Sequence, residues 1–262
     1  MDVSLLWLCL PLGLLVGFLS GLFGIGGGAL MVPCLSWLFL QSMEQDAALH
    51  TAWATAMAAI VVTSLMSMWQ HHQRGGVLWS VWQMMLPSVL IGVLIGTYLV
   101  MQLHAAWLAS VFALFMVYVA ANLCWQGQPR EHTRLGIWGF SVAGMGIGLM
   151  SALLSIGGGT MTVPFLAKQN IAMSQAVGTS AALGVPIALV ASAAYLWMPT
   201  PQNLATPSGW VVWQVVGLMS LGSMLTVRYG AAWAHKLQGR ILRRLFAGLL
   251  LLLAGQMLFM MG

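Results

Sequence analysis

The sequence predicts an all-α polytopic membrane protein made of two inverted repeats with five segments each. This prediction depends on the scarcity of charge, on apolar runs of membrane-spanning length and on an internal repeat. Only 5% of the 262 residues are charged, 60% are hydrophobic and the mean hydropathy is +0.92. A water-soluble domain has about a quarter of its residues charged. A chain with so few charges is therefore expected to be solvated by lipid.

An internal repeat appears at an offset of 131 residues, half the length of the chain. Segment 22–35, LFGIGGGALMVPCL, aligns with segment 153–166, LLSIGGGTMTVPFL. The same offset pairs further residues: Ser20 with Ser151, Trp79 with Trp210 and Tyr98 with Tyr229. Chance similarity between apolar segments would not keep one register over this distance. We expect two homologous halves, 1–128 and 129–262, which are joined near 126–133 and together form one domain.

Each half divides into five apolar segments. They cover 3–22, 29–41, 48–69, 79–102 and 106–125 in the first half, and 134–154, 159–168, 176–197, 209–230 and 240–261 in the second. The second segment of each half is short, since ten residues of helix extend only about 15 Å and the bilayer core is about 30 Å thick. We expect eight long and two short transmembrane segments, with helix breaks at the glycine-rich turns before the short ones.

The positions of the basic residues favour inverted halves over parallel halves. If the short segments complete a crossing, all nine Lys and Arg residues fall on one side, opposite three acidic residues: Asp2, Glu44 and Asp46. If the short segments turn back, Arg74 and Arg130 lie opposite the basic cluster at 236–244. The positive-inside rule favours the first arrangement. We therefore expect a multi-pass inner-membrane protein with both termini periplasmic, whose first segment is a retained helix and not a signal peptide.

The two Gly-Gly-Gly turns are the candidate binding site for a small anion. A helix N-terminus within the membrane presents unpaired N–H groups and about half a positive charge, and glycine lets a ligand approach the backbone closely. Two such termini facing one cavity can bind an anion without a buried charged side chain. The alternative is that the glycines only permit close helix packing, as we expect for Gly13, Gly17 and Gly21. The candidate residues of the turns are Gly26, Gly27, Gly28, Gly157, Gly158 and Gly159.

A short threonine motif follows each turn, AVGTS at 176–180 and ALHTA at 48–52. Thr51, Thr179 and Ser180 can donate hydroxyl groups to an anion, or can equally cap a helix or bond back to their own helix. With its paired GIGGG or SIGGG turns, each followed by Val-Pro, the chain resembles the sulfite exporter TauE/SafE family over essentially its whole length. His50 and Ala52 depart from the family pattern in the first threonine motif.

The resemblance implies that the two halves form one transport domain for small sulfur-containing anions such as sulfite, sulfoacetate or related organosulfonates, moved usually outward. No Asp or Glu lies inside a predicted span, so the expected mechanism is export of an anion driven by membrane potential. Import or exchange of another anion, such as thiosulfate or a carboxylate, stays open, as does a homo-oligomeric state.

Other kinds of chemistry find little support in the sequence. Cys9, Cys34 and Cys124 form no CxxC pattern, so neither a disulfide framework nor a metal site is expected, and no cofactor is implied. The net charge of +5 does not predict a nucleic-acid partner, because in a membrane chain the position of each charge matters more than the sum. An integral-membrane enzyme would need converging Asp, Glu, His or Cys residues, and the sequence shows no such cluster.

Overall fold

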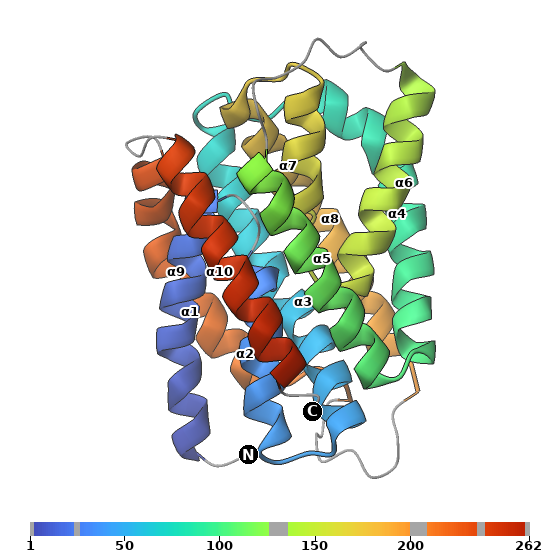
Figure 1. The fold of residues 1–262 in the computed structure, drawn as a ribbon, viewed down its shortest axis with the longest axis vertical. Coiled ribbons are helices and arrows are strands. Elements are labelled where there is room, and N and C mark those ends of the chain that lie inside the picture. The colour runs from blue at the N-terminus through green and yellow to red at the C-terminus, as the bar shows by residue number, and fades with distance from the viewer. Residues whose placement is uncertain (1–2, 24–26, 126–135, 200–208, 235–238, 260–262) are drawn as a thin grey trace.

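The computed structural model describes residues 3–23, 27–125, 136–199, 209–234 and 239–259, which form ten α-helices and no β-strand (Figure 1). The helices are α1 (Val3–Phe23), α2 (Gly28–Leu40), α3 (Gln45–His72), α4 (Trp79–Gln102), α5 (Ala105–Trp125), α6 (Ile137–Leu153), α7 (Gly159–Lys168), α8 (Met173–Trp197), α9 (Trp213–Ala234) and α10 (Gly239–Phe259). Their bounds lie within four residues of the segments expected from the sequence.

The largest difference between expected and observed bounds is at α9, which begins at Trp213 instead of residue 209. The residues before it are held by distant parts of the chain. The indole N–H of Trp210 donates to the Pro199 carbonyl at 3.2 Å, and the Val212 N–H donates to the Thr55 hydroxyl at 3.1 Å. The Thr55 hydroxyl thus satisfies a backbone N–H before α9 from a position 157 residues away in the chain.

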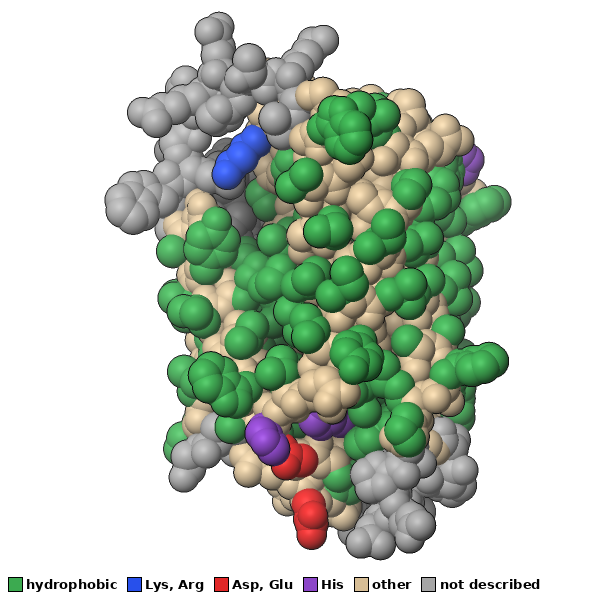
Figure 2. Space-filling model, turned by 90° about the vertical axis from the view of Figure 1, so that its right-hand side faces the viewer, with side chains coloured by type: hydrophobic (Ala, Val, Ile, Leu, Met, Phe, Trp, Pro, Cys, Tyr) green, Lys and Arg blue, Asp and Glu red, His purple; other side chains and the backbone are tan. Residues whose placement is uncertain are grey.

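The protein is an all-helical, multi-pass membrane protein. Four of the described helices, α3, α4, α5 and α8, are long and apolar enough to cross a bilayer. Apolar side chains cover the face of the molecule seen in Figure 2, and the charged side chains visible there lie near its ends, acidic at the lower end and basic at the upper. This distribution suits a body surrounded by lipid and flanked by water.

Glycines allow two pairs of helices to pack closely. A Cβ atom on Gly13 of α1 would lie 2.6 Å from the Met219 carbonyl oxygen of α9, and a Cβ atom on Gly17 would overlap the backbone of Ser223. Between α4 and α6, a Cβ atom on Gly148 would overlap the Val89 carbonyl. The prediction that Gly13 and Gly17 are packing residues is confirmed, because helices in lipid associate chiefly through such close backbone contact.

The contacts between helices have a regular pattern. Helix α1 packs on α9 as α6 packs on α4, α2 packs on α3 as α7 packs on α8, and α3 packs on α9 as α8 packs on α4. The pairs α3–α8 and α5–α10 complete the arrangement. Every one of these contacts is preserved when each helix is exchanged for the one five places away in the chain. Apart from α2–α3 and α7–α8, the helices of these pairs are not neighbours in the chain.

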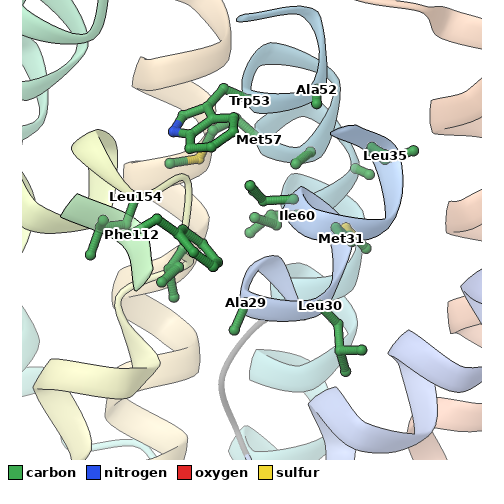
Figure 3. Packing of buried hydrophobic residues seen from close by; sticks show 14 of the residues in the cluster. Ala29, Leu30, Met31, Leu35, Ala52, Trp53, Met57, Ile60, Phe112 and Leu154 are labelled. Atoms are coloured by element: carbon green, nitrogen blue, oxygen red, sulfur yellow. The ribbon is translucent and has the colours of Figure 1, made fainter. Parts of the chain in front are cut away.

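Helix α3 packs against α8, α2 and α9 and is largely buried. Trp53 is its largest fully buried side chain, and its ring meets that of Phe112 edge-on, with 6.0 Å between the ring centroids. Figure 3 shows Ile60 further along α3, beside the start of α2, and a Cβ atom on Gly28 would lie 2.7 Å from Ile60 Cδ1. The short helix α2 thus begins against the middle of α3, and this contact positions the first glycine-rich turn inside the bundle.

Candidate substrate site at two helix breaks

The helices α2 and α7 both begin with a glycine in a left-handed backbone conformation. Gly27 precedes α2 with φ 82° and ψ −10°, and Gly158 precedes α7 with φ 76° and ψ −18°. An L-residue with a side chain would be less stable than glycine in this region by about 1–2 kcal/mol. With 13 and 10 residues, the two helices extend only about 20 and 15 Å, so neither spans a bilayer core by itself.

The first turn of α7 leaves backbone donors without acceptors. The Gly158 carbonyl accepts from the N–H groups of Met161 and Thr162, as the Gly27 carbonyl does from Leu30 and Met31. No side chain caps either helix. Among the described residues, the N–H groups of Gly159 and Thr160 have no acceptor, although both residues are buried. Such a helix N-terminus carries a partial positive charge and favours an anion.

The two breaks lie against each other. A Cβ atom on Gly28 would lie 2.9 Å from the Cα atom of Ile156 and still closer to the Ser155 carbonyl oxygen. The first turn of α2 therefore rests on the turn before α7, and Gly27, Gly28, Gly157 and Gly159 are all buried. Helix α2 extends from this point into the lower half of the bundle in Figure 1 and α7 into the upper half. Of the predicted glycines, Gly26 lies outside the described residues.

Unpartnered hydroxyl groups accompany the breaks. A Cβ atom on Gly158 would lie 3.6 Å from Thr162 Oγ1 and 3.7 Å from Ser151 Oγ, and one on Gly27 would lie 3.7 Å from Ser20 Cβ. The hydroxyls of Ser20 and Thr162 are buried and have no hydrogen-bond partner among the described residues. The sequence prediction of the site does not contain Ser20, Ser151 or Thr162. The internal repeat could have indicated two of them, because Ser20 and Ser151 align at the same offset of 131 residues as the glycine turns.

The threonine motifs lie apart from one another. Helices α3 and α8 pack antiparallel, since Gly184 meets Ser64 and Gly178 meets His71, so Thr51 and Thr179 lie at opposite ends of the pair. The Thr179 hydroxyl accepts a hydrogen bond from the Leu78 N–H at 2.9 Å and holds the connection between α3 and α4. Thr51 and Ser180 are fully buried, and their hydroxyls have no partner among the described residues.

Both ring nitrogens of His50 lie within hydrogen-bond distance of a backbone carbonyl oxygen, and a neutral ring donates to one of the two. Its Nδ1 lies 2.7 Å from the Asp46 carbonyl oxygen and its Nε2 lies 3.1 Å from the Val100 carbonyl oxygen. The Asp46 carboxylate in turn accepts a hydrogen bond from the Ala105 N–H at 2.8 Å. These contacts join the start of α3 to the end of α4 and the start of α5. The described residues contain no group of three or more His, Cys, Asp or Glu that could hold a metal ion.

Comparison with known proteins decides the family. The sequence model described as "Sulfite exporter TauE/SafE" matches residues 9–257. The chain belongs to the sulfite exporter TauE/SafE family. It is 31% identical to a "Probable membrane transporter protein" of Haemophilus influenzae over 253 residues, which cover 94% of this chain and 96% of the relative.

Two more distant relatives have similar names. A probable membrane transporter protein of Methanocaldococcus jannaschii is 23% identical over 94% of this chain and 92% of its own length. The probable membrane transporter protein YdhB of Bacillus subtilis is 20% identical over 91% of this chain and 96% of its own length. No solved structure is significantly similar to the chain. As a member of the TauE/SafE family, the protein is a transmembrane transporter.

Proposed function

We propose that this TauE/SafE-family protein exports a small sulfur-containing anion, such as sulfite, sulfoacetate or a related organosulfonate, across the bacterial inner membrane. The observation that carries the proposal is the meeting of two buried helix breaks, where the N–H groups of Gly159 and Thr160 have no acceptor in the part of the chain that the structure describes. A sulfite or sulfonate group has several acceptor oxygens and a negative charge, which match these donors. The family description, which names sulfite, supports this class of anion.

The proposed transport domain consists of two inverted repeats, 1–128 and 129–262. Three features support this: the repeat at offset 131, the nearly equal backbone angles of Gly27 and Gly158, and helix contacts that persist when the halves are exchanged. Transporters with such repeats bind the substrate between the halves, where helices are interrupted near the middle of the membrane. The six turn glycines therefore form the proposed anion site, and Thr51, Thr179 and Ser180 remain candidates for further contacts.

The proposed driving force is the membrane potential. The acidic residues that the structure describes, Glu44 and Asp46, both lie at the start of α3. The described middle of the bundle therefore contains no carboxylate that could carry a coupling proton. Moving one negative charge outward across an inside-negative membrane is favourable by about 2.3 kcal/mol per 100 mV. The positive-inside rule places Lys168 and Arg74 in the cytoplasm and both chain termini in the periplasm.

A flux measurement in proteoliposomes tests the proposal. Purified protein is reconstituted with sulfoacetate inside, and a potassium diffusion potential is imposed without a pH gradient. We expect efflux that increases with the potential and exceeds that of protein-free vesicles. Sulfite, thiosulfate, taurine and a simple carboxylate serve as competing anions. Flux of a carboxylate alone, or flux that only a pH gradient drives, would contradict the proposed substrate or the proposed driving force.

A further inference from the structure

Several hydroxyl groups in this helical bundle bond back to their own helix. Ser36 donates to the Val32 carbonyl at 2.8 Å, Thr97 to Val93 at 2.9 Å and Ser110 to Ala106 at 2.8 Å. Serine and threonine commonly do this in membrane helices, because it satisfies the hydroxyl without another helix. A buried hydroxyl with no hydrogen-bond partner among the described residues has its donor available for a ligand or a water molecule.

A group of such hydroxyls lies along the interface of α3 and α8. Each belongs to a residue that is at most 2% exposed, and none has a hydrogen-bond partner among the described residues: Ser64, Ser67 and Ser180. Ser64 and His71 both contact α8, through Gly184 and Gly178. Ser67 lies between them on the same face of α3, because residues three and four apart are neighbours on a helix.

These hydroxyls flank the second helix break. A Cβ atom on Gly184 would lie 2.7 Å from the Gly157 carbonyl oxygen and 2.9 Å from Ser64 Oγ, so the Ser64 hydroxyl and the break are neighbours. The Tyr195 hydroxyl, on α8, shares a hydrogen bond with Ser155 just before the break, and the Ser155 hydroxyl donates to the Trp53 carbonyl at 3.2 Å. Ser64 and Tyr195 therefore approach the break from two different helices.

The remaining two hydroxyls continue from the break toward one end of the bundle. Ser180 is one turn from Gly184 along α8, in the direction of its N-terminus, and Ser67 lies one turn beyond Ser64 along α3. Because the two helices are antiparallel, both steps lead toward His71 and Gly178. Helix α7 also packs against α8 and begins at the break, so its Lys168 end lies in the same direction.

We propose that the α3–α8 interface, from the break to the His71 end of α3, is the route of the anion, with Ser64 as a direct contact of the bound anion and Ser67 and Ser180 lining the way to it. Hydroxyls donate hydrogen bonds to sulfonate oxygens without a fixed charge, which favours passage because a conducted ion must also be released. The nature of the anion rests on the proposed function. The position of the route depends only on the unpartnered hydroxyls.

Cysteine labelling tests the route. In a variant without Cys9, Cys34 and Cys124, single cysteines replace Ser64, Ser67 or Ser180, and a matched control replaces Ser36, which is equally buried but bonded to its own helix. Vesicles of both orientations are treated with two methanethiosulfonate reagents of similar size, one bearing a sulfonate and one a trimethylammonium group. Sulfoacetate serves as the protecting anion, because sulfite itself reacts with these reagents.

We expect the sulfonate reagent to label Ser64→Cys, Ser67→Cys and Ser180→Cys from the Arg74 side, faster than the cationic reagent, and sulfoacetate to slow the reaction. Labelling no faster than that of Ser36→Cys overturns the route. Labelling with no preference for the anionic reagent and no protection by sulfoacetate supports a hydrated route but overturns the proposed anion. The two proposals can therefore fail separately.

Removing one hydroxyl tests the direct contact. Ser64→Ala removes one oxygen, and we expect it to lower flux at limiting sulfoacetate at least about tenfold, the effect of losing one hydrogen bond to a charged group. The amount of protein and its melting temperature should not fall, because the lost hydroxyl had no partner among the described residues. Thr97→Val is the control, since its hydroxyl bonds within α4. Unchanged flux with a lower melting temperature would make Ser64 a structural residue.

Discussion

Gly158→Ala tests most directly whether the breaks bind the anion through the backbone. The substitution adds one Cβ atom at φ 76°, which destabilises the fold by about 1–2 kcal/mol because an L-residue rarely adopts this conformation. The new atom would lie 2.8 Å from Cδ1 of Ile187, the flexible end of a side chain. Displacing that group from its preferred rotamer adds about 1 kcal/mol. The fold should tolerate this sum, whereas the methyl group next to the Gly159 N–H should hinder approach of an anion.

Two other glycines separate the possible causes of a lost flux. Gly75 has φ 67° and no atom within 4 Å of the position that a Cβ atom would take, so Gly75→Ala introduces the backbone strain alone. Gly148 meets the Val89 backbone, so Gly148→Ala requires α4 and α6 to move apart, which destabilises by about 1–3 kcal/mol. The first control isolates strain and the second isolates loss of helix packing.

The assay measures sulfoacetate flux in proteoliposomes per molecule of reconstituted transporter, together with abundance in the membrane and melting temperature. We expect Gly158→Ala to lose most of its flux per molecule, Gly75→Ala to keep it, and Gly148→Ala to have low abundance but normal flux per molecule. Gly27→Ala should behave as Gly158→Ala does, since its Cβ atom would meet only the Val16 side chain closely. Equal flux per molecule in Gly158→Ala and Gly75→Ala would refute anion binding at the break and direct attention to Thr51.

Three further predictions concern orientation and stability. A cysteine in place of Glu44 should react with an impermeant thiol reagent outside intact cells and one in place of Arg74 should not; the reverse pattern would overturn the orientation. His50→Phe removes the hydrogen bond that the ring donates to a backbone carbonyl and should destabilise by about 0.5–1.5 kcal/mol, so its melting temperature should fall below that of His50→Gln, which retains a donor. Ser155→Ala and Ser155→Gly both lose the hydrogen bond to the Trp53 carbonyl, but only glycine relieves the backbone strain at φ 48°. Ser155→Ala should therefore have the lower melting temperature of the two, and equal melting temperatures would contradict this account.

The positions of the helices and their breaks could be predicted from the sequence, because both depend on local properties. A run of apolar residues forms a helix in lipid, since each backbone N–H must find its acceptor within the segment. A triple glycine interrupts it, since only glycine adopts the φ of Gly27 and Gly158 without strain. The packing role of Gly13 and Gly17 was likewise predictable from their spacing of four residues.

The partners of the hydroxyl groups could not be predicted in this way. Thr51, Thr179 and Ser180 look alike in sequence, yet Thr179 is bonded to Leu78 while the other two have no partner among the described residues. Leu78 is 101 residues from Thr179 in the chain, and only the packing of α8 beside the α3–α4 connection brings them together. The same holds for Ser64 and the Gly157 carbonyl, which meet because Gly184 has no side chain.

By itself, the sequence determined that the chain is a multi-pass helical membrane protein with two glycine-rich interruptions, because hydropathy and backbone freedom are properties of short segments. Only the tertiary structure decided that the Gly28 turn rests on Ser155 and Ile156, and that Ser64 and Tyr195 approach the same break from different helices. These contacts join residues far apart in the chain. Their geometry depends on how whole helices pack, and no local pattern encodes that packing.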